Sequence, residues 1–166
     1  SNEANSELSN SVNDPIYDSL RFVLFKANAQ IENLKKKLKR SDNGNYLKFT
    51  NNKGYEVYYV GQVSAGKANG EGVALFSSGG RYEGAWQLNK REGKGTYYWP
   101  DGAYYEGSYE NDKRSGLGIY VWPNGEKFVG QWVDDQRDGF GTFYDKEGKI
   151  TVNGLWDQDE LIEEQK

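Results

Sequence analysis

The 166-residue sequence contains no cysteine and no histidine, and only three prolines. Without cysteine the chain cannot form disulfides, thiol nucleophiles or thiolate metal sites. Without histidine it lacks the commonest general base and the commonest zinc ligand. No apolar run approaches the roughly 18 to 20 residues that a membrane-spanning helix requires, so we expect the chain as given to be soluble. These absences favour a protein that is not an enzyme and needs no cofactor and no metal.

The chain also lacks a strong excess of basic charge. Its formal net charge is −4, and basic residues cluster only between Lys35 and Arg40. A nucleic-acid surface needs a concentrated basic patch that can displace counterions from phosphates, so we expect no nucleic-acid partner. The compartment stays open. A cytoplasmic or membrane-peripheral location fits the chain as given, and an extracytoplasmic one fits if an upstream signal peptide or anchor has been removed.

Glycine and aromatic residues, by contrast, are abundant and recur in register. The sequence has 21 glycines and 15% aromatic residues. A repeat of 23 residues connects Trp86, Tyr109 and Trp132. The repeat positions that we expect to be structural are Tyr82, Gly84, Trp86, Tyr105, Gly107, Tyr109, Phe128, Gly130 and Trp132, followed one residue out of step by Gly154 and Trp156.

Each unit has the pattern of a β-hairpin. Tyr82, Gly84 and Trp86 alternate with other residues, as expected for a strand with one aromatic face. A glycine near an aromatic residue on that face leaves a notch that a neighbouring ring can fill, so successive hairpins gain their core from each other. We expect the tight turns of the hairpins at Asn89-Lys90, Asp112-Lys113 and Asp135-Gln136.

The pattern Tyr-x-Gly-x-Trp, followed by Gly-x-Gly and then Asp/Asn-Gly, resembles the MORN (membrane occupation and recognition nexus) repeat. The resemblance extends from Tyr59 to Trp156. It implies an elongated, single-layer antiparallel sheet with a groove along one face. The predicted fold class is therefore mainly β, a sheet of tandem MORN hairpins preceded by one long N-terminal amphipathic helix.

The predicted organisation has four parts: a disordered leader at 1–13, an amphipathic helix at 14–43, a repeat array at 45–157 and a C-terminal tail at 158–166. The predicted array contains an irregular first hairpin at 45–58, repeats at 59–81, 82–104, 105–127 and 128–151, and a half-repeat at 152–157. An apolar stripe runs along the predicted helix from Ile16 to Leu38. It fits either packing on the sheet or pairing with a second copy in a coiled coil.

Two sets of residues are candidates for binding. A single-layer sheet cannot bury both faces, so some aromatic residues are expected to form an exposed patch for a partner. The candidates for this patch are Tyr98, Trp99, Trp122 and Tyr144. The second set repeats every 23 residues at the hairpin tips and forms a candidate rim for an anionic partner: Arg91, Arg114 and Arg137.

The sequence therefore predicts a non-catalytic protein-interaction scaffold whose sheet or groove accepts a helix or an extended peptide. The helix at 14–43 is expected to pack on the sheet or to mediate a homodimer. One alternative is a peripheral module that associates with anionic phospholipid. Another is a regulatory fragment of a larger enzyme, since MORN arrays adjoin catalytic domains in some members of the family.

Overall fold

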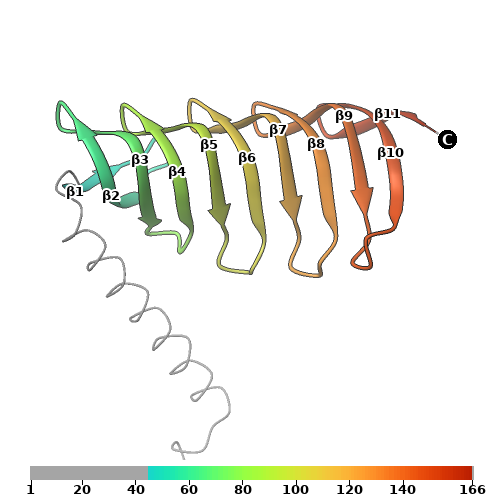
Figure 1. Ribbon diagram of the computed structural model, residues 1–166, viewed down its shortest axis with the longest axis horizontal. Coiled ribbons are helices and arrows are strands. Elements are labelled where there is room, and N and C mark those ends of the chain that lie inside the picture. The colour runs from blue at the N-terminus through green and yellow to red at the C-terminus, as the bar shows by residue number, and fades with distance from the viewer. Residues whose placement is uncertain (1–44, 166) are drawn as a thin grey trace, which may run out of the picture. The chain divides into compact units, whose positions relative to one another are not determined.

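The computed structural model describes residues 45–165, which form one antiparallel sheet (Figure 1). The sheet has 11 strands in the order of the sequence, so every strand pairs with its neighbours along the chain. This confirms the predicted antiparallel sheet of hairpins. The leader and the helix predicted for 1–43 lie outside the described residues. The strands are β1 (Asn45–Thr50), β2 (Glu56–Ser64), β3 (Lys67–Phe76), β4 (Arg81–Gln87), β5 (Lys90–Tyr98), β6 (Tyr104–Glu110), β7 (Lys113–Val121), β8 (Lys127–Val133), β9 (Gln136–Tyr144), β10 (Ile150–Asp157) and β11 (Glu160–Glu164).

The two-residue hairpin tips lie along one side of the sheet, and the longer turns lie along the other (Figure 1). At a tip, two successive residues have positive φ, as in a type I′ turn: 50° at Leu88 and 69° at Asn89. The same pair recurs at Asn111 with Asp112 and at Asp134 with Asp135. The predicted tips were therefore wrong by one residue. Asn and Asp mark the second residue of each tip, because they tolerate positive φ. The first residue also has positive φ, but it can be a residue type that does not signal a turn, such as Leu88.

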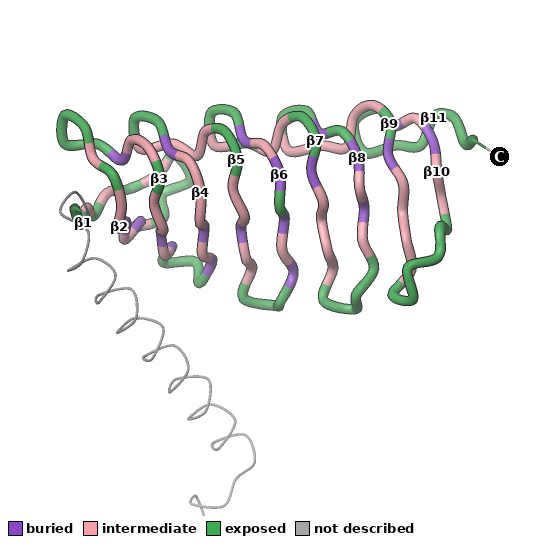
Figure 2. Tube along the Cα trace, viewed as in Figure 1, coloured by how far each residue is buried: buried purple, intermediate pink, exposed green. Residues whose placement is uncertain are grey.

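The core lies on one face of the sheet, which we call the ring face. Four aromatic side chains there are completely buried: Tyr59, Tyr82, Tyr105 and Phe128. Figure 2 shows buried positions recurring from hairpin to hairpin along the strands, with the turns exposed. Each buried ring meets the next hairpin in an edge-to-face contact, for example Tyr82 with Tyr109 at 5.2 Å and Tyr105 with Trp132 at 5.4 Å. The rings therefore bind successive repeats to each other.

Glycine makes this packing possible because each buried ring lies flat across the backbone of its own hairpin. A Cβ added at Gly95 would lie 2.1 Å from Tyr82 Oη, and one added at Gly118 would lie 2.2 Å from Tyr105 Oη. The hydroxyl of Tyr105 reaches beyond the glycine and donates a hydrogen bond to the carbonyl of Ser108 at 3.1 Å. The glycine notches predicted from the sequence are thus present, but the prediction that a neighbouring hairpin fills them was wrong, because the ring over each notch belongs to the same hairpin.

The two ends of the sheet depart from the regular repeat. At the first end, the Asn51 carboxamide accepts hydrogen bonds from the backbone N–H groups of Lys53 and Tyr55, which shapes the turn between β1 and β2. At the other end, β10 has a bulge between Ile150 and Val152. The predicted half-repeat and tail need correction, because residues 158–159 form a tip and β11 completes the last hairpin. The sequence signal is weak there because β11 contains no glycine and no aromatic residue.

Candidate binding surfaces of the sheet

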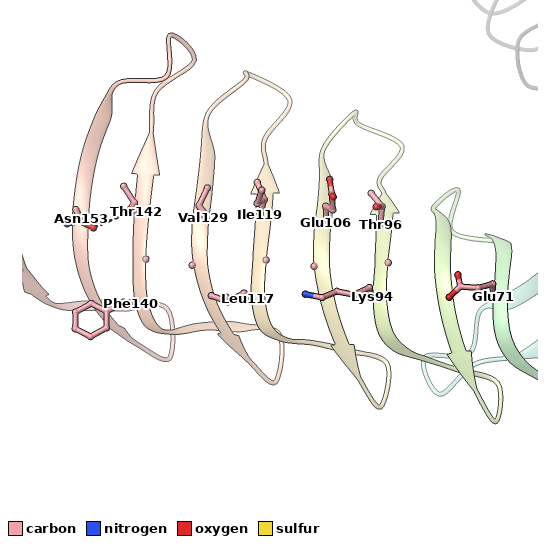
Figure 3. Close-up of a pocket in the computed structure, with 15 residues that line it drawn as sticks. Glu71, Lys94, Thr96, Glu106, Leu117, Ile119, Val129, Phe140, Thr142 and Asn153 are labelled. Atoms are coloured by element: carbon pink, nitrogen blue, oxygen red, sulfur yellow. Dashed lines mark hydrogen bonds between the residues drawn. The ribbon is translucent and has the colours of Figure 1, made fainter.

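A groove crosses the face opposite to the rings, which we call the open face (Figure 3). Its volume is about 770 Å³. Residues on either side of each glycine point to this face, because side chains alternate along a strand. The floor is therefore a row of glycines, which the buried rings cover only on the other face of the sheet: Gly95, Gly107, Gly118, Gly130 and Gly141.

Two rows of side chains form the walls of the groove (Figure 3). Over β7–β9 the walls are apolar, with Leu117, Ile119, Val129 and Phe140. Leu117 is 65% exposed and Phe140 is 54% exposed. Contiguous exposed apolar side chains are uncommon on soluble proteins and often mark a binding site. This cluster is an exposed apolar feature of the open face and a candidate contact for a partner.

The other part of the groove is charged. Glu71, Lys94 and Glu106 line it over β3–β6, and no ion pair joins them to any other described residue. The groove thus changes along its length from charged to apolar. A ligand that runs across the strands would meet both kinds of surface.

The four predicted aromatic residues do not form one patch. Tyr98 and Trp99 are adjacent in sequence, so their side chains lie on opposite faces of the sheet. On the open face, the guanidinium of Arg81 lies 4.3 Å from the ring of Tyr98, and the ammonium of Lys127 lies 4.8 Å from the ring of Tyr144. On the ring face, Trp99 and Trp122 continue the aromatic packing. The single patch expected from the sequence is therefore wrong, because it ignored this alternation.

The predicted arginine rim has partners within the sheet. The Nε of Arg91 donates to the carboxylate of Asp112 at 3.2 Å, that of Arg114 to Asp135 at 3.1 Å, and that of Arg137 to Asp159 at 2.8 Å. In each case the carboxylate belongs to the tip of the following hairpin. Each guanidinium also lies over aromatic rings, and the shortest distance is 4.2 Å, from Arg114 to Trp132. The structure thus accounts for the three arginines as bridges between repeats, without an anionic ligand.

The buried tyrosines have shifted ionisation. Desolvation by burial raises the pKa of Tyr59 to about 12, and the nearby Glu71 carboxylate adds to the shift. Burial also raises the pKa of Tyr82, Tyr105 and Tyr109, while a neighbouring arginine partly opposes the effect. The folded state therefore favours the protonated phenols, and these tyrosines stabilise the sheet only while they are protonated.

Alkaline pH is expected to unfold the array cooperatively. The pKa of these tyrosines is higher in the folded state than the value of about 10 in an unfolded chain. The contribution of these tyrosines to the free energy of unfolding should therefore be constant below pH 10 and fall as the pH rises from about 10 through 12, by about 1.4 kcal/mol per pH unit for each tyrosine. In an absorbance titration, the buried tyrosines should ionise only as the β-sheet circular dichroism disappears. Ionisation near pH 10 with the sheet intact would contradict the described burial.

Within residues 45–165, no three Asp, Glu, His or Cys side chains come together in a group that could hold a metal ion. This part of the chain also contains no helix with the length and hydropathy of a transmembrane segment. The main surfaces of the described sheet are therefore the groove of the open face and the aromatic rows of the ring face.

Comparison with known families accounts for the repeat. The MORN repeat model matches four consecutive segments, 59–81, 82–104, 105–127 and 128–150, which together make up more than half of the chain. The chain belongs to the MORN repeat family. The resemblance inferred from the repeated glycine and aromatic residues is confirmed. The matched segments begin at Tyr59, Tyr82, Tyr105 and Phe128, which are the four fully buried rings of the MORN array.

Other comparisons add little. No curated relative matches the sequence. Among solved structures, the chain is similar to the SAS-4 (dCPAP) TCP domain of Drosophila melanogaster, which was solved in complex with a proline-rich motif of Ana2 (dSTIL). The identity is 12%, the TM-score is 0.29, and the match covers 66% of this chain and 77% of that chain. At this TM-score the likeness supports no inference about the MORN array.

The groove residues Leu117 and Phe140 were not among the predicted binding residues. A signal for them exists in the sequence, because Lys94, Leu117 and Phe140 occupy the middle position of successive Gly-x-Gly segments. Alternation from the flanking glycines assigns this position to the open face. A lysine followed by two large apolar residues at equivalent positions would have indicated the charged and apolar parts of the groove.

Proposed function

We propose that this protein is a non-catalytic protein-interaction module whose MORN array binds a helix or an extended peptide in the groove of the open face. The observation that carries the proposal is the groove itself, with a glycine floor, a charged part and an exposed apolar part. Peptide ligands commonly place apolar anchors in such grooves while polar groups at the rim fix their orientation. The absence of histidine and cysteine from the sequence supports the non-catalytic part of the proposal.

The test uses peptides selected from a random displayed library against the immobilised chain. Replacing Leu117 and Phe140 together by aspartate is expected to weaken binding of the selected peptides by at least about tenfold, because charges then replace apolar contacts worth about 1.4 kcal/mol or more. Binding is measured by isothermal titration calorimetry. Both side chains are largely exposed, so the double variant should keep its fold.

Val133→Asp is the matched control. Val133 is 50% exposed but lies at the end of β8, next to a hairpin tip, and does not line the groove. The substitution introduces the same kind of charge. If the peptide binds only in the groove, its affinity for this variant should stay within about twofold of its affinity for the unsubstituted chain. Selected peptides that bind the groove variant as well as the control variant would refute the groove as the binding site.

The other hypotheses from the sequence stay predictions. Sedimentation with anionic liposomes at low salt would detect the lipid-associated alternative, and bound protein should decrease as salt screens the interaction. Comparing the mass in solution of the chain with and without residues 14–43 would detect the predicted homodimer. A larger mass only when these residues are present would support it.

A further inference from the structure

A continuous row of aromatic rings on the ring face is not used by the proposed groove. The row consists of Tyr97, Trp99, Tyr120, Trp122 and Phe143, and neighbouring ring centroids are 4.6 to 5.3 Å apart. The β4–β5 and β6–β7 hairpins each contribute two rings, and the β8–β9 hairpin contributes only Phe143. Only Tyr97 is buried, at 9% exposure, and the other four are partly exposed. The row therefore presents ring surface to solvent along the array.

The two tryptophans of this row also have available hydrogen-bond donors. The indole N–H groups of Trp132 and Trp156 donate to backbone carbonyls of the sheet, at 3.4 and 3.2 Å. Within residues 45–165, no protein acceptor lies in hydrogen-bond distance of the indole N–H of Trp99 or Trp122, and neither nitrogen is buried. Tryptophan at binding surfaces typically combines ring contact with donation from this group. Trp99 and Trp122 thus differ from Trp132 and Trp156, whose donors are used within the sheet, and from Trp86, whose unpaired N–H is buried.

One end of the row opens into a cavity of about 330 Å³. Tyr55 and Lys53, from the turn between β1 and β2, form one wall, and Trp99 and Pro100 form part of another. Arg91 and Arg114 also line the cavity, but each is already paired with an aspartate. Lys53 makes no ion pair with any other described residue. The cavity therefore offers one cation for an acidic group of a ligand.

The spacing of the row matches one type of peptide backbone. Two strands of a hairpin occupy about 9.6 Å across the sheet, since neighbouring strands are about 4.8 Å apart. A polyproline II helix advances about 9.3 Å in three residues. Prolines at every third position would consequently meet equivalent rings on successive hairpins, a pair on each of the first two and Phe143 on the third. Such segments bind aromatic grooves through proline–ring contacts and through hydrogen bonds from tryptophan N–H to peptide carbonyls.

We propose that the ring row binds a proline-rich segment in the polyproline II conformation, which runs across the strands with a proline at every third residue and an acidic residue at the end near Lys53. The ring stacking, the two indole donors, the repeat distance and the charge of the cavity all favour this ligand. The surface is separate from the groove of the open face, so this inference does not depend on the proposed function.

The test uses the full chain and two synthetic peptides of identical length and composition, each with three prolines. The first begins with Asp-Glu and continues with proline at every third position. The second has the same acidic start but proline at every fourth position, so that its prolines do not coincide with successive hairpins. Tryptophan fluorescence and calorimetry should show binding of the first peptide and at least about tenfold weaker binding of the second. No binding of the first peptide at millimolar concentration, or equal binding of both, would overturn the proposal.

Variants locate the site. Trp99→Phe and Trp122→Phe keep a ring but remove the indole donor, and each should weaken binding of the first peptide about five- to tenfold. Lys53→Gln should weaken it only when the peptide carries its acidic residues. Tyr98→Phe, a neighbouring substitution on the open face, is the control and should leave affinity unchanged. If Leu117→Asp with Phe140→Asp abolishes peptide binding while the tryptophan variants bind normally, the peptide occupies the open face and the proposal is wrong.

Discussion

Gly118→Ala is expected to destabilise the array by about 3 to 5 kcal/mol, which is a large part of the stability of an ordinary domain. The added Cβ would lie 2.2 Å from Tyr105 Oη and 2.4 Å from Tyr105 Cζ. The ring of Tyr105 cannot move away without losing packing contacts, because it is completely buried and packs against Tyr109 and Trp132. The backbone of Gly118 has no positive φ, so the cost comes from this overlap and not from backbone strain. Thermal unfolding followed by circular dichroism measures the change.

Gly102→Ala is the control for this experiment. Gly102 has a φ of 96°, but no atom lies within 4 Å of an added Cβ. The alanine would therefore cause backbone strain but no overlap, and it should lower the free energy of unfolding by about 1 to 2 kcal/mol. Replacing Tyr105 by leucine should cost less in the Gly118→Ala background than in the unsubstituted chain, because the overlap is partly relieved. Equal losses for Gly118→Ala and Gly102→Ala would contradict the notch.

Arg114→Ala is expected to lower the stability by about 2 to 3 kcal/mol. The substitution removes the pair with Asp135 on the next hairpin and the contact with the ring of Trp132. A fully buried pair would lose more when one partner is removed, but these side chains are 19% and 35% exposed, so solvent screens part of the interaction. Because the bridge joins two repeats, urea unfolding should also become less cooperative.

The neighbouring pair of Lys113 and Asp134 supplies the matched control. It joins the same two hairpins, with the ammonium 2.9 Å from the carboxylate, but its side chains are 49% and 70% exposed. Lys113→Ala should therefore change stability by at most about 1 kcal/mol. If both alanine variants have the same unfolding midpoint, the arginine bridges do not stabilise the stack, and Arg91, Arg114 and Arg137 regain their interpretation as a rim for an anionic partner.

Sequence periodicity predicted the repeat accurately because the packing of each hairpin needs the same side chains. The ring of Tyr105 requires glycine beneath it and an aromatic residue on the next hairpin. This requirement recurs every 23 residues and is visible without coordinates. Exact tip positions were less predictable, because both Leu88 and Asn89 adopt positive φ and only the second is a residue type that favours it.

The candidate sites were predicted less well than the fold. Arg91, Arg114 and Arg137 recur in sequence like a surface rim, but their partners lie 21 or 22 residues ahead, on the following tips. Distances between repeats depend on how hairpins stack, which no single repeat encodes. The exposed apolar residues Leu117 and Phe140 were missed for a related reason, since their position varies between repeats and periodicity marks only the positions that do not vary.

The sequence by itself determined the strand order and the face that carries the core, because alternation within a strand and the 23-residue step are local properties of the chain. It also determined membership of the MORN family. Only the tertiary structure decided that the arginines bridge repeats and that Tyr98 and Trp99 serve different faces. It alone revealed the groove and the ring row. These features depend on side chains from separate hairpins, which come together only when the repeats stack.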